Sequence, residues 1–233
     1  MKYTHLLIDM DGTLFDFNSA EKAALIKTCS YLGCEYSSDL HILYHNINLS
    51  VWKDYEQGKM TQHELQEKRF LLFQSMIGTN RNNHQVNNYY QSQLEQQNQL
   101  LPGALETVKQ LYNRNCKLYI ATNGTSSTQR KRFFSTPLSN YFIDIYISEE
   151  IGFQKPQTEF FNYCIGKINA DKKDILMIGD SLTSDILGGY QSGIDTCYIN
   201  PTSLVLKNED IKPTYIIPNI SQLLDIIFSS PPC

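Results

Sequence analysis

Residues 3–13 read Tyr-Thr-His-Leu-Leu-Ile-Asp-Met-Asp-Gly-Thr, and they are the clearest indication of the fold in this sequence. A short apolar run that ends at the turn residues Asp11 and Gly12 is typical of a buried strand, which we place at residues 3–9. Reactive groups in open α/β sheets gather outside the carboxyl ends of the strands. We therefore expect this first strand to deliver Asp9 and Asp11 to a functional crevice.

A long helical segment interrupts the strand pattern. Apolar residues recur at helical spacing from residue 18 to about residue 99. We predict helices at residues 20–32, 39–56, 62–76 and 83–97. The pairs Asn18 with Glu21 and Thr61 with Glu64 have the spacing of capping boxes, which mark the first turn of a helix.

Strands and helices alternate in the rest of the chain. Strands are expected at residues 117–121, 143–147, 175–178, 196–199 and 215–217, and helices at residues 103–114, 126–135, 158–168, 184–192 and 220–228. Such alternation predicts a parallel sheet covered by helices on both faces. The expected fold class is α/β, with a Rossmann-like parallel sheet core at residues 1–17 and 100–233 and an inserted all-helical cap domain at residues 18–99.

The composition excludes several classes of protein. The chain has 233 residues, 41% of them hydrophobic, which suits a core plus a smaller inserted domain. Its 20 Lys and Arg against 24 Asp and Glu give a net charge of −4. The chain therefore lacks the excess of positive charge that is typical of proteins that bind the nucleic-acid backbone. No segment approaches the ~20 apolar residues of a membrane span, and the N-terminal run is too short for a signal peptide. We expect a cytoplasmic protein that binds neither a nucleic-acid polymer nor a membrane.

The cysteines and histidines show no metal-binding pattern. The six cysteines are scattered without a Cys-x-x-Cys pair, which argues against a zinc knuckle or a thioredoxin-type site. His41 and His45 are four residues apart on a predicted helix, but no nearby carboxylate or third ligand supports a transition-metal site. We expect these two histidines to lie on the surface or in the core of the cap.

Polar residues gather at the predicted carboxyl ends of four strands. These residues are Asp9 and Asp11, Thr122 and Asn123, Lys155, and Asp180 with Asp185. Four carboxylates in one crevice repel one another, so a hard divalent cation such as Mg²⁺ is expected to neutralise them. Lys155 adds a positive charge, and backbone N–H groups after Thr122 can cradle phosphate oxygens. This combination of groups favours chemistry on phosphoryl groups, in which a carboxylate can itself be the nucleophile.

Each of these residues also has an ordinary structural explanation. Aspartates such as Asp9 favour the turn that follows a strand. Thr122 and Asn123 can cap the next helix, and Asp185 can be the N-cap of the helix at residues 184–192. Lys155 can be a solvated lysine before a proline. The order of the motifs and their shared location favour the functional interpretation.

The groups of residues at the four strand ends form four motifs: Asp9-Met10-Asp11-Gly12-Thr13, Thr122-Asn123-Gly124, Lys155-Pro156, and Gly179-Asp180 with Asp185. In this order they resemble the motifs of the haloacid dehalogenase-like superfamily of phosphotransferases. The resemblance spans nearly the whole chain and implies that Asp9 is the nucleophile and Asp11 the general acid/base. It also implies that Thr122, with Asn123 beside it, binds the transferring phosphoryl group and that Lys155 stabilises its charge.

The same resemblance implies a magnesium site and a small helical cap. Asp180 would bind Mg²⁺ together with Asp9 and the main-chain carbonyl of Asp11, and Asp185 would support the metal. A set of short runs looks like the nucleoside 5′-monophosphatase (pyrimidine nucleotidase) branch. These runs are Ile147-Ser148-Glu149-Glu150, Lys155-Pro156, Asp180-Ser181, Ser184-Asp185-Ile186 and Gly188-Gly189. The implied partner is a small-molecule phosphomonoester.

Two other functions fit part of the pattern. A sugar-phosphate phosphatase or mutase of the same fold is possible, although mutases usually look like Lys-Pro-x-Pro where Gln157 and Thr158 follow Pro156 here. A non-catalytic, phosphate-responsive regulator would have no use for Asp11, because a base there would hydrolyse the acyl phosphate that such a switch must keep.

Substrate preference is expected to reside in the cap and in the flap at residues 14–17. A nucleobase needs a flat apolar partner, which Phe15, Phe17, Trp52 or Tyr55 could offer.

Overall fold

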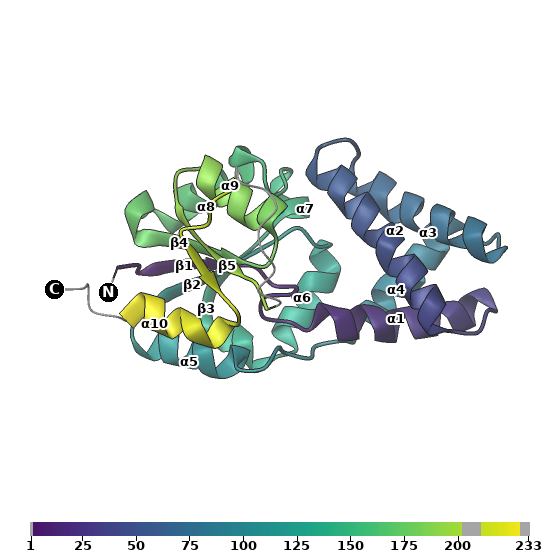
Figure 1. Cartoon of the computed structure of the whole chain (residues 1–233), viewed down its shortest axis with the longest axis horizontal. Helices are drawn as coiled ribbons and strands as arrows, with labels where there is room; N and C mark the ends of the chain where they lie inside the picture. The colour runs from purple at the N-terminus through teal and green to yellow at the C-terminus, as the bar shows by residue number, and fades with distance from the viewer. Residues whose placement is uncertain (1, 202–210, 229–233) are drawn as a thin grey trace. The chain divides into compact units, whose positions relative to one another are not determined.

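Six parallel strands form one sheet in the computed structural model, which describes residues 2–201 and 211–228 (Figure 1). The sheet order is β3-β2-β1-β4-β5-β6. The strands are β1 (His5–Ile8), β2 (Lys117–Thr122), β3 (Phe142–Ile147), β4 (Ile175–Gly179), β5 (Asp195–Ile199) and β6 (Tyr215–Ile217). After β1 the chain builds the sheet outward through β2 and β3, and it then returns to the other side of β1 with β4. This reversal is the kind of switch point at which open α/β sheets bind ligands.

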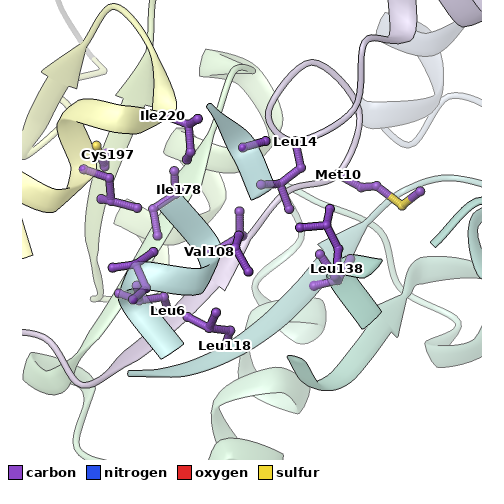
Figure 2. Close-up of a cluster of buried hydrophobic side chains, with 14 of the residues drawn as sticks. Leu6, Met10, Leu14, Val108, Leu118, Leu138, Ile178, Cys197 and Ile220 are labelled. Atoms are coloured by element: carbon purple, nitrogen blue, oxygen red, sulfur yellow. The ribbon is translucent and has the colours of Figure 1, made fainter. Parts of the chain in front are cut away.

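Alternate side chains of β1 enter two separate apolar clusters. Leu6 and Ile8 pack in one cluster with Val108 of helix α5 (Ala104–Asn113), and Figure 2 labels Leu6 and Val108 in it. Leu7 packs in the other cluster with Phe161 of helix α8 (Thr158–Ile168). Helices α5 and α10 (Leu223–Phe228) cover one face of the sheet, and α8 and α9 (Leu187–Gln191) cover the other (Figure 1). Each of these leucines is fully buried, which contributes about 1.5–3 kcal/mol to the free energy of folding. The central strand is thereby fixed on both faces.

The helices of the α/β unit follow the predicted positions with two differences. They are α5 (Ala104–Asn113), α6 (Ser126–Phe134), α7 (Ser148–Ile151), α8 (Thr158–Ile168), α9 (Leu187–Gln191) and α10 (Leu223–Phe228). Short 3₁₀ turns lie at Pro137–Tyr141, Lys172–Asp174 and Ile220–Gln222. The single-turn helix α7 was not predicted. The helix expected at residues 184–192 begins instead as a π-helical turn, Leu182–Ile186, before α9.

The inserted segment forms a separate unit made of helices. It spans Phe17–Asn98, against the predicted residues 18–99. Its elements are α1 (Phe17–Leu32), α2 (Ser38–Glu56), α3 (Gln62–Ile77) and α4 (Asn83–Leu94). Tyr44, Phe70, Phe73 and Tyr90 are fully buried in its core. The structure confirms the predicted α/β fold, a parallel sheet with an inserted helical unit.

One of the two predicted capping boxes is present. The Thr61 hydroxyl accepts the Glu64 N–H at 3.2 Å, and the Glu64 carboxylate accepts the Thr61 N–H at 2.7 Å. The prediction of a capping box at Asn18 and Glu21 is wrong, because α1 already begins at Phe17, one residue before Asn18. The Glu21 carboxylate turns instead toward α2.

The interior of the helical unit holds this carboxylate in a polar network. Glu21 is 1% exposed, and its oxygens accept hydrogen bonds from Asn48 Nδ2 at 2.8 Å and lie 2.8 Å from His45 Nδ1. His41 Nε2 lies 3.6 Å from the same carboxylate. The expectation that no carboxylate lies near the two histidines is therefore wrong. Their acidic partner is distant in sequence and was brought close by helix packing.

In the part of the chain that the structure describes, no helix combines the length and apolar character needed to cross a bilayer.

Candidate active site

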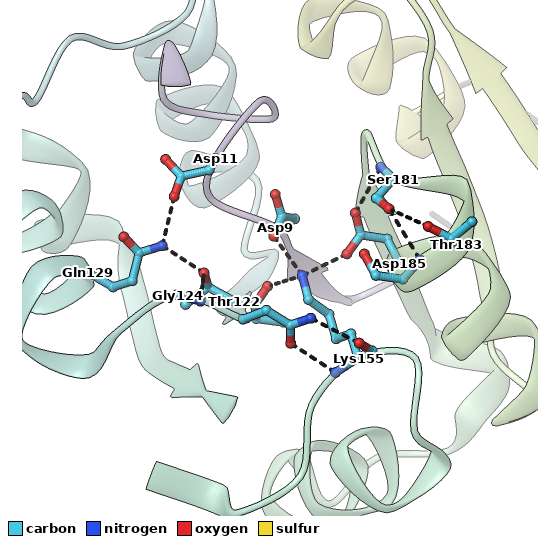
Figure 3. A network of polar contacts seen from close by, with 12 residues as sticks. Asp9, Asp11, Thr122, Gly124, Gln129, Lys155, Ser181, Thr183 and Asp185 are labelled. Carbon is cyan, nitrogen blue, oxygen red and sulfur yellow. Dashed lines mark hydrogen bonds and ion pairs between the residues drawn. The ribbon is translucent and has the colours of Figure 1, made fainter. Parts of the chain in front are cut away.

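A buried lysine organises the carboxyl ends of the central strands. Lys155 is 2% exposed, and its ammonium donates to Asp9 Oδ1 at 2.6 Å, to Asp185 Oδ1 at 2.7 Å and to the Ala121 carbonyl at 2.7 Å (Figure 3). These bonds use all three of its protons. The lysine therefore ties the end of β1 to the end of β2 and to the turn after β4.

The crowding of charge shifts the pKa values of this group. Burial by itself lowers the pKa of Lys155, but the charges of Asp185 and Asp9 outweigh it and raise the pKa above its usual value. Burial raises the pKa of Asp9 well above its ordinary range; Lys155 opposes this shift, and Asp185 and Asp180 add to it. A second cation beside Asp9 would favour its ionised form.

Three carboxylates converge where a cation would fit. Oxygens of Asp9, Asp180 and Asp185 lie within 4.8 Å of one another. Asp180 keeps contact with solvent, yet the protein packed around it and the charge of Asp185 raise its pKa to about 7. Three carboxylates face one ammonium here, and oxygen ligands suit Mg²⁺. The residues present thus fit a hard divalent cation.

Glycine at position 12 allows Asp180 to approach the first strand. Gly12 has a φ of +84°, and a Cβ placed on it would lie 2.1 Å from Asp180 Oδ2. Any larger residue would be strained and would also collide with the carboxylate. The glycine of the Asp-x-Asp-Gly-Thr motif is therefore required both by the turn and by the neighbouring acidic group.

Asp185 does not cap the helix that follows it. Ser181 is the N-cap residue, and its hydroxyl accepts the Ser184 N–H at 3.2 Å. The Asp185 side chain is 1% exposed, and its second oxygen accepts the Ser181 N–H at 3.1 Å. The N-cap explanation is wrong, because the π-helical turn directs this carboxylate inward to Lys155.

Thr122, the last residue of β2, and Asn123, which follows it, make different contacts. Thr122 is 2% exposed, and its hydroxyl accepts the Gly124 N–H at 3.2 Å and Gln129 Nε2 at 2.7 Å. The amide of Asn123 pairs with the main chain of Lys155, in bonds of 2.9 Å from Nδ2 to the carbonyl and 2.8 Å from the Lys155 N–H. The Asn123 side chain thus positions the lysine, and substrate binding by Asn123 stays a prediction. Neither residue caps α6, whose N-cap is Thr125.

Sequence reasoning missed the residues that hold Asp11. Arg132 Nη1 donates to Asp11 Oδ1 at 2.6 Å, and Gln129 Nε2 donates to Asp11 Oδ2 at 2.9 Å (Figure 3 shows the latter). Both residues come from α6. Their i, i+3 spacing on a predicted helix directly after the Thr122 motif was the signal that could have found them, because it places them on one helix face.

The four aromatic residues considered as base partners differ in exposure. Phe15 is fully buried and Tyr55 is 5% exposed. Trp52 packs edge-on against Tyr55, with ring centroids 5.6 Å apart, and Phe17 packs against the apolar core of the helical unit; both are partly exposed. Phe15 is therefore unavailable for stacking on a base.

Comparison with known proteins matches the chain to one family along most of its length. Residues 6–199 match the pattern of the haloacid dehalogenase-like hydrolases. The chain is 37% identical over 227 residues to the HAD-hydrolase YfnB of Bacillus subtilis, covering 97% of this chain and 96% of YfnB. It is 37% identical over 228 residues to the pyrimidine 5′-nucleotidase PynA of Streptococcus pneumoniae, covering 97% of this chain and 96% of PynA.

The same relationship holds in three dimensions. The crystal structure of Bacillus subtilis YfnB bound to magnesium matches with a TM-score of 0.92 and 37% identity, covering 98% of this chain and 100% of that one. The resemblance seen in the motifs is thereby confirmed. The protein is an enzyme, and it belongs to the haloacid dehalogenase-like hydrolases.

Proposed function

We propose that this hydrolase is a Mg²⁺-dependent phosphomonoesterase that acts through an aspartyl-phosphate intermediate on small phosphometabolites such as nucleoside 5′-monophosphates. One observation carries the proposal: two aspartates at the end of β1 are held by different partners. Asp9 pairs with the buried ammonium of Lys155, whereas Asp11 pairs with Arg132 and Gln129. Two carboxyl groups in distinct environments can take distinct roles.

The geometry supports a two-step hydrolysis. In the first step a carboxylate oxygen of Asp9 forms a bond to phosphorus, the bond from phosphorus to the leaving oxygen breaks, and that oxygen takes a proton from Asp11. In the second step Asp11 takes a proton from water as the water oxygen bonds to phosphorus. The bond to Asp9 then breaks, which releases inorganic phosphate and regenerates both carboxyl groups.

Lys155, Thr122 and the acidic residues provide the electrostatic setting. Asp9, Asp180 and the main-chain carbonyl of Asp11 would hold Mg²⁺, with Asp185 in support. When bound, the cation supplies positive charge that offsets the phosphoryl oxygens and keeps the Asp9 carboxylate ionised. Lys155 supplies a second, fixed positive charge next to the attacking oxygen. The Thr122 hydroxyl accepts hydrogen bonds from Gly124 and Gln129, so its own proton is the one it would donate to a phosphate oxygen.

Nucleoside monophosphates are the substrate class that the relatives favour. PynA, which matches this chain over 97% of its length, bears the name pyrimidine 5′-nucleotidase. We expect purified protein to release phosphate from UMP and dTMP faster than from hexose phosphates, with release abolished by EDTA and restored by Mg²⁺. The measurement is kcat/KM over a panel of phosphomonoesters. Equal rates on all esters would refute the nucleotide preference, and full activity in EDTA would refute the metal dependence.

Replacing Asp180 with Ala is expected to raise the Mg²⁺ concentration for half-maximal activity at least about tenfold, because it removes one of few protein ligands. The measurement is phosphate release across a Mg²⁺ titration. Asp171→Ala is the matched control, because Asp171 is exposed and pairs with Lys173 rather than with the active-site residues, and it is expected to leave the titration unchanged. An unchanged titration in Asp180→Ala would exclude Asp180 as a ligand.

A further inference from the structure

Arg132 is a fully buried arginine whose charge is directed at the proposed general acid/base. Its exposed fraction is 0%, and Nη1 lies 2.6 Å from Asp11 Oδ1. The Asp11 side chain is 25% exposed, so the pair reaches from the interior to the surface of the site. A buried guanidinium costs free energy unless it is paired, and this one is paired with a group that must move protons.

The same guanidinium contacts both ends of the turn that carries Asp11. Its central carbon lies 5.1 Å from the centroid of the Phe15 ring, a cation–π contact. The turn between them is closed by the Gly12 N–H, which donates to the Phe15 carbonyl at 3.0 Å. Arg132 therefore fixes the turn as well as the carboxylate on it.

Gln129 completes the hold on the carboxylate. Its Nε2 donates to Asp11 Oδ2 at 2.9 Å and to the Thr122 hydroxyl at 2.7 Å, while its Oε1 accepts Arg132 Nη1 at 3.2 Å. Each oxygen of Asp11 thus has its own donor from α6. The orientation of the carboxylate relative to Thr122, the proposed phosphate-binding residue, is set by these two side chains.

We infer that Arg132 is a positioning residue that orients Asp11 for proton transfer to the leaving group. This inference rests on the proposed function. Proton transfer by a positioned side chain contributes about 10²–10⁴-fold to a rate, and a displacement of ~1 Å can remove about 10²-fold. Loss of Arg132 therefore affects most those substrates whose leaving oxygen needs a proton.

Two phosphomonoesters separate this role from simple support of the fold. The alkoxide that leaves a nucleoside 5′-monophosphate needs the proton from Asp11, whereas p-nitrophenolate leaves without one. For Arg132→Met we expect kcat/KM to fall about 10²-fold for UMP and less than about tenfold for p-nitrophenyl phosphate. The ratio kcat/KM is the quantity to compare, because it reports the first transfer step and not the shared hydrolysis of the intermediate.

Arg130 on the same helix provides a matched control. Its guanidinium pairs with Glu150 at 2.7 Å, away from Asp11, and its side chain is 41% exposed. Arg130→Met is expected to leave both kcat/KM values unchanged. If Arg132→Met does not fold, as judged by circular dichroism, Arg132→Lys takes its place. This variant keeps the positive charge but loses the planar guanidinium. We therefore expect kcat/KM to fall more for UMP than for p-nitrophenyl phosphate again, but with a smaller difference between the two esters.

A double-mutant cycle with Asp11→Asn completes the test. We expect Asp11→Asn to lower kcat/KM more for UMP than for p-nitrophenyl phosphate, as Arg132→Met does. In the Asp11→Asn background, Arg132→Met is expected to cause no further fall in kcat/KM for UMP. Equal losses on both esters, or full additivity with Asp11→Asn, would overturn the positioning role and leave Arg132 a structural residue. Wild-type protein that hydrolyses neither ester would instead refute the proposed function, so the two failures are distinguishable.

Discussion

Replacing Asp9 with Asn is expected to lower phosphate release by about 10⁴-fold or more, because an amide cannot form the acyl phosphate. The amide oxygen can still accept the hydrogen bond that Lys155 now donates to Asp9 Oδ1 at 2.6 Å, so the fold is expected to survive. The measurements are kcat for UMP with saturating Mg²⁺ and the circular dichroism spectrum of the variant.

Asp171→Asn is the control for the Asp9 variant. Asp171 is exposed and pairs at 3.3 Å with Lys173, which is also exposed. The same chemical change there is expected to leave kcat unaltered. Activity of Asp9→Asn within tenfold of wild type would remove Asp9 from the role of nucleophile.

Replacing Lys155 with Met is expected to lower the free energy of unfolding by about 3–5 kcal/mol and to abolish activity. The ammonium compensates Asp9 and Asp185, whose side chains are 10% and 1% exposed. Removing one partner of a buried ion pair leaves uncompensated charge, which is the costly change. Urea denaturation in EDTA measures the effect, because added Mg²⁺ would replace part of the lost positive charge.

Lys173→Met is the matched control for this stability measurement. The Lys173 side chain is 78% exposed, and its ion pair with Asp171 lies on the surface. A change of less than about 0.5 kcal/mol is expected there. If Lys155→Met lowered the free energy of unfolding by less than about 1 kcal/mol, the stability of the buried carboxylates Asp9 and Asp185 would not depend on the lysine.

Sequence patterns predicted those strands, helices and caps that depend on interactions between residues close together in the chain. The parallel sheet followed from alternating strands and helices, since apolar runs of strand length bury both faces. The capping box of Thr61 and Glu64 formed because both of its bonds lie within one helical turn. The family could likewise be identified from the sequence, because its motifs are short, ordered and tied to the ends of strands.

Predictions failed where a distant group competed for the same side chain. Glu21 has the spacing of a capping residue, yet its carboxylate pairs with Asn48 and His45 from another helix. Asp185 has the position of an N-cap, yet Lys155 and a π-helical turn draw it inward. A buried charge gains more from an opposite charge than from a cap, and only packing brings the two together.

Sequence patterns alone place Asp9, Asp11, Thr122 and Asp180 at or just after strand ends, and Lys155 in the loop that follows β3 and α7, because strand and helix periodicity order them along the chain without any knowledge of side-chain contacts. Tertiary structure decided which groups hold them. Asn123 fixes the main chain of Lys155, and Gln129 and Arg132 fix Asp11. The physical reason is the sequence separation of the interacting residues. Placement at a strand end depends on neighbours along the chain, whereas side-chain orientation depends on hydrogen bonds between residues as many as 146 positions apart.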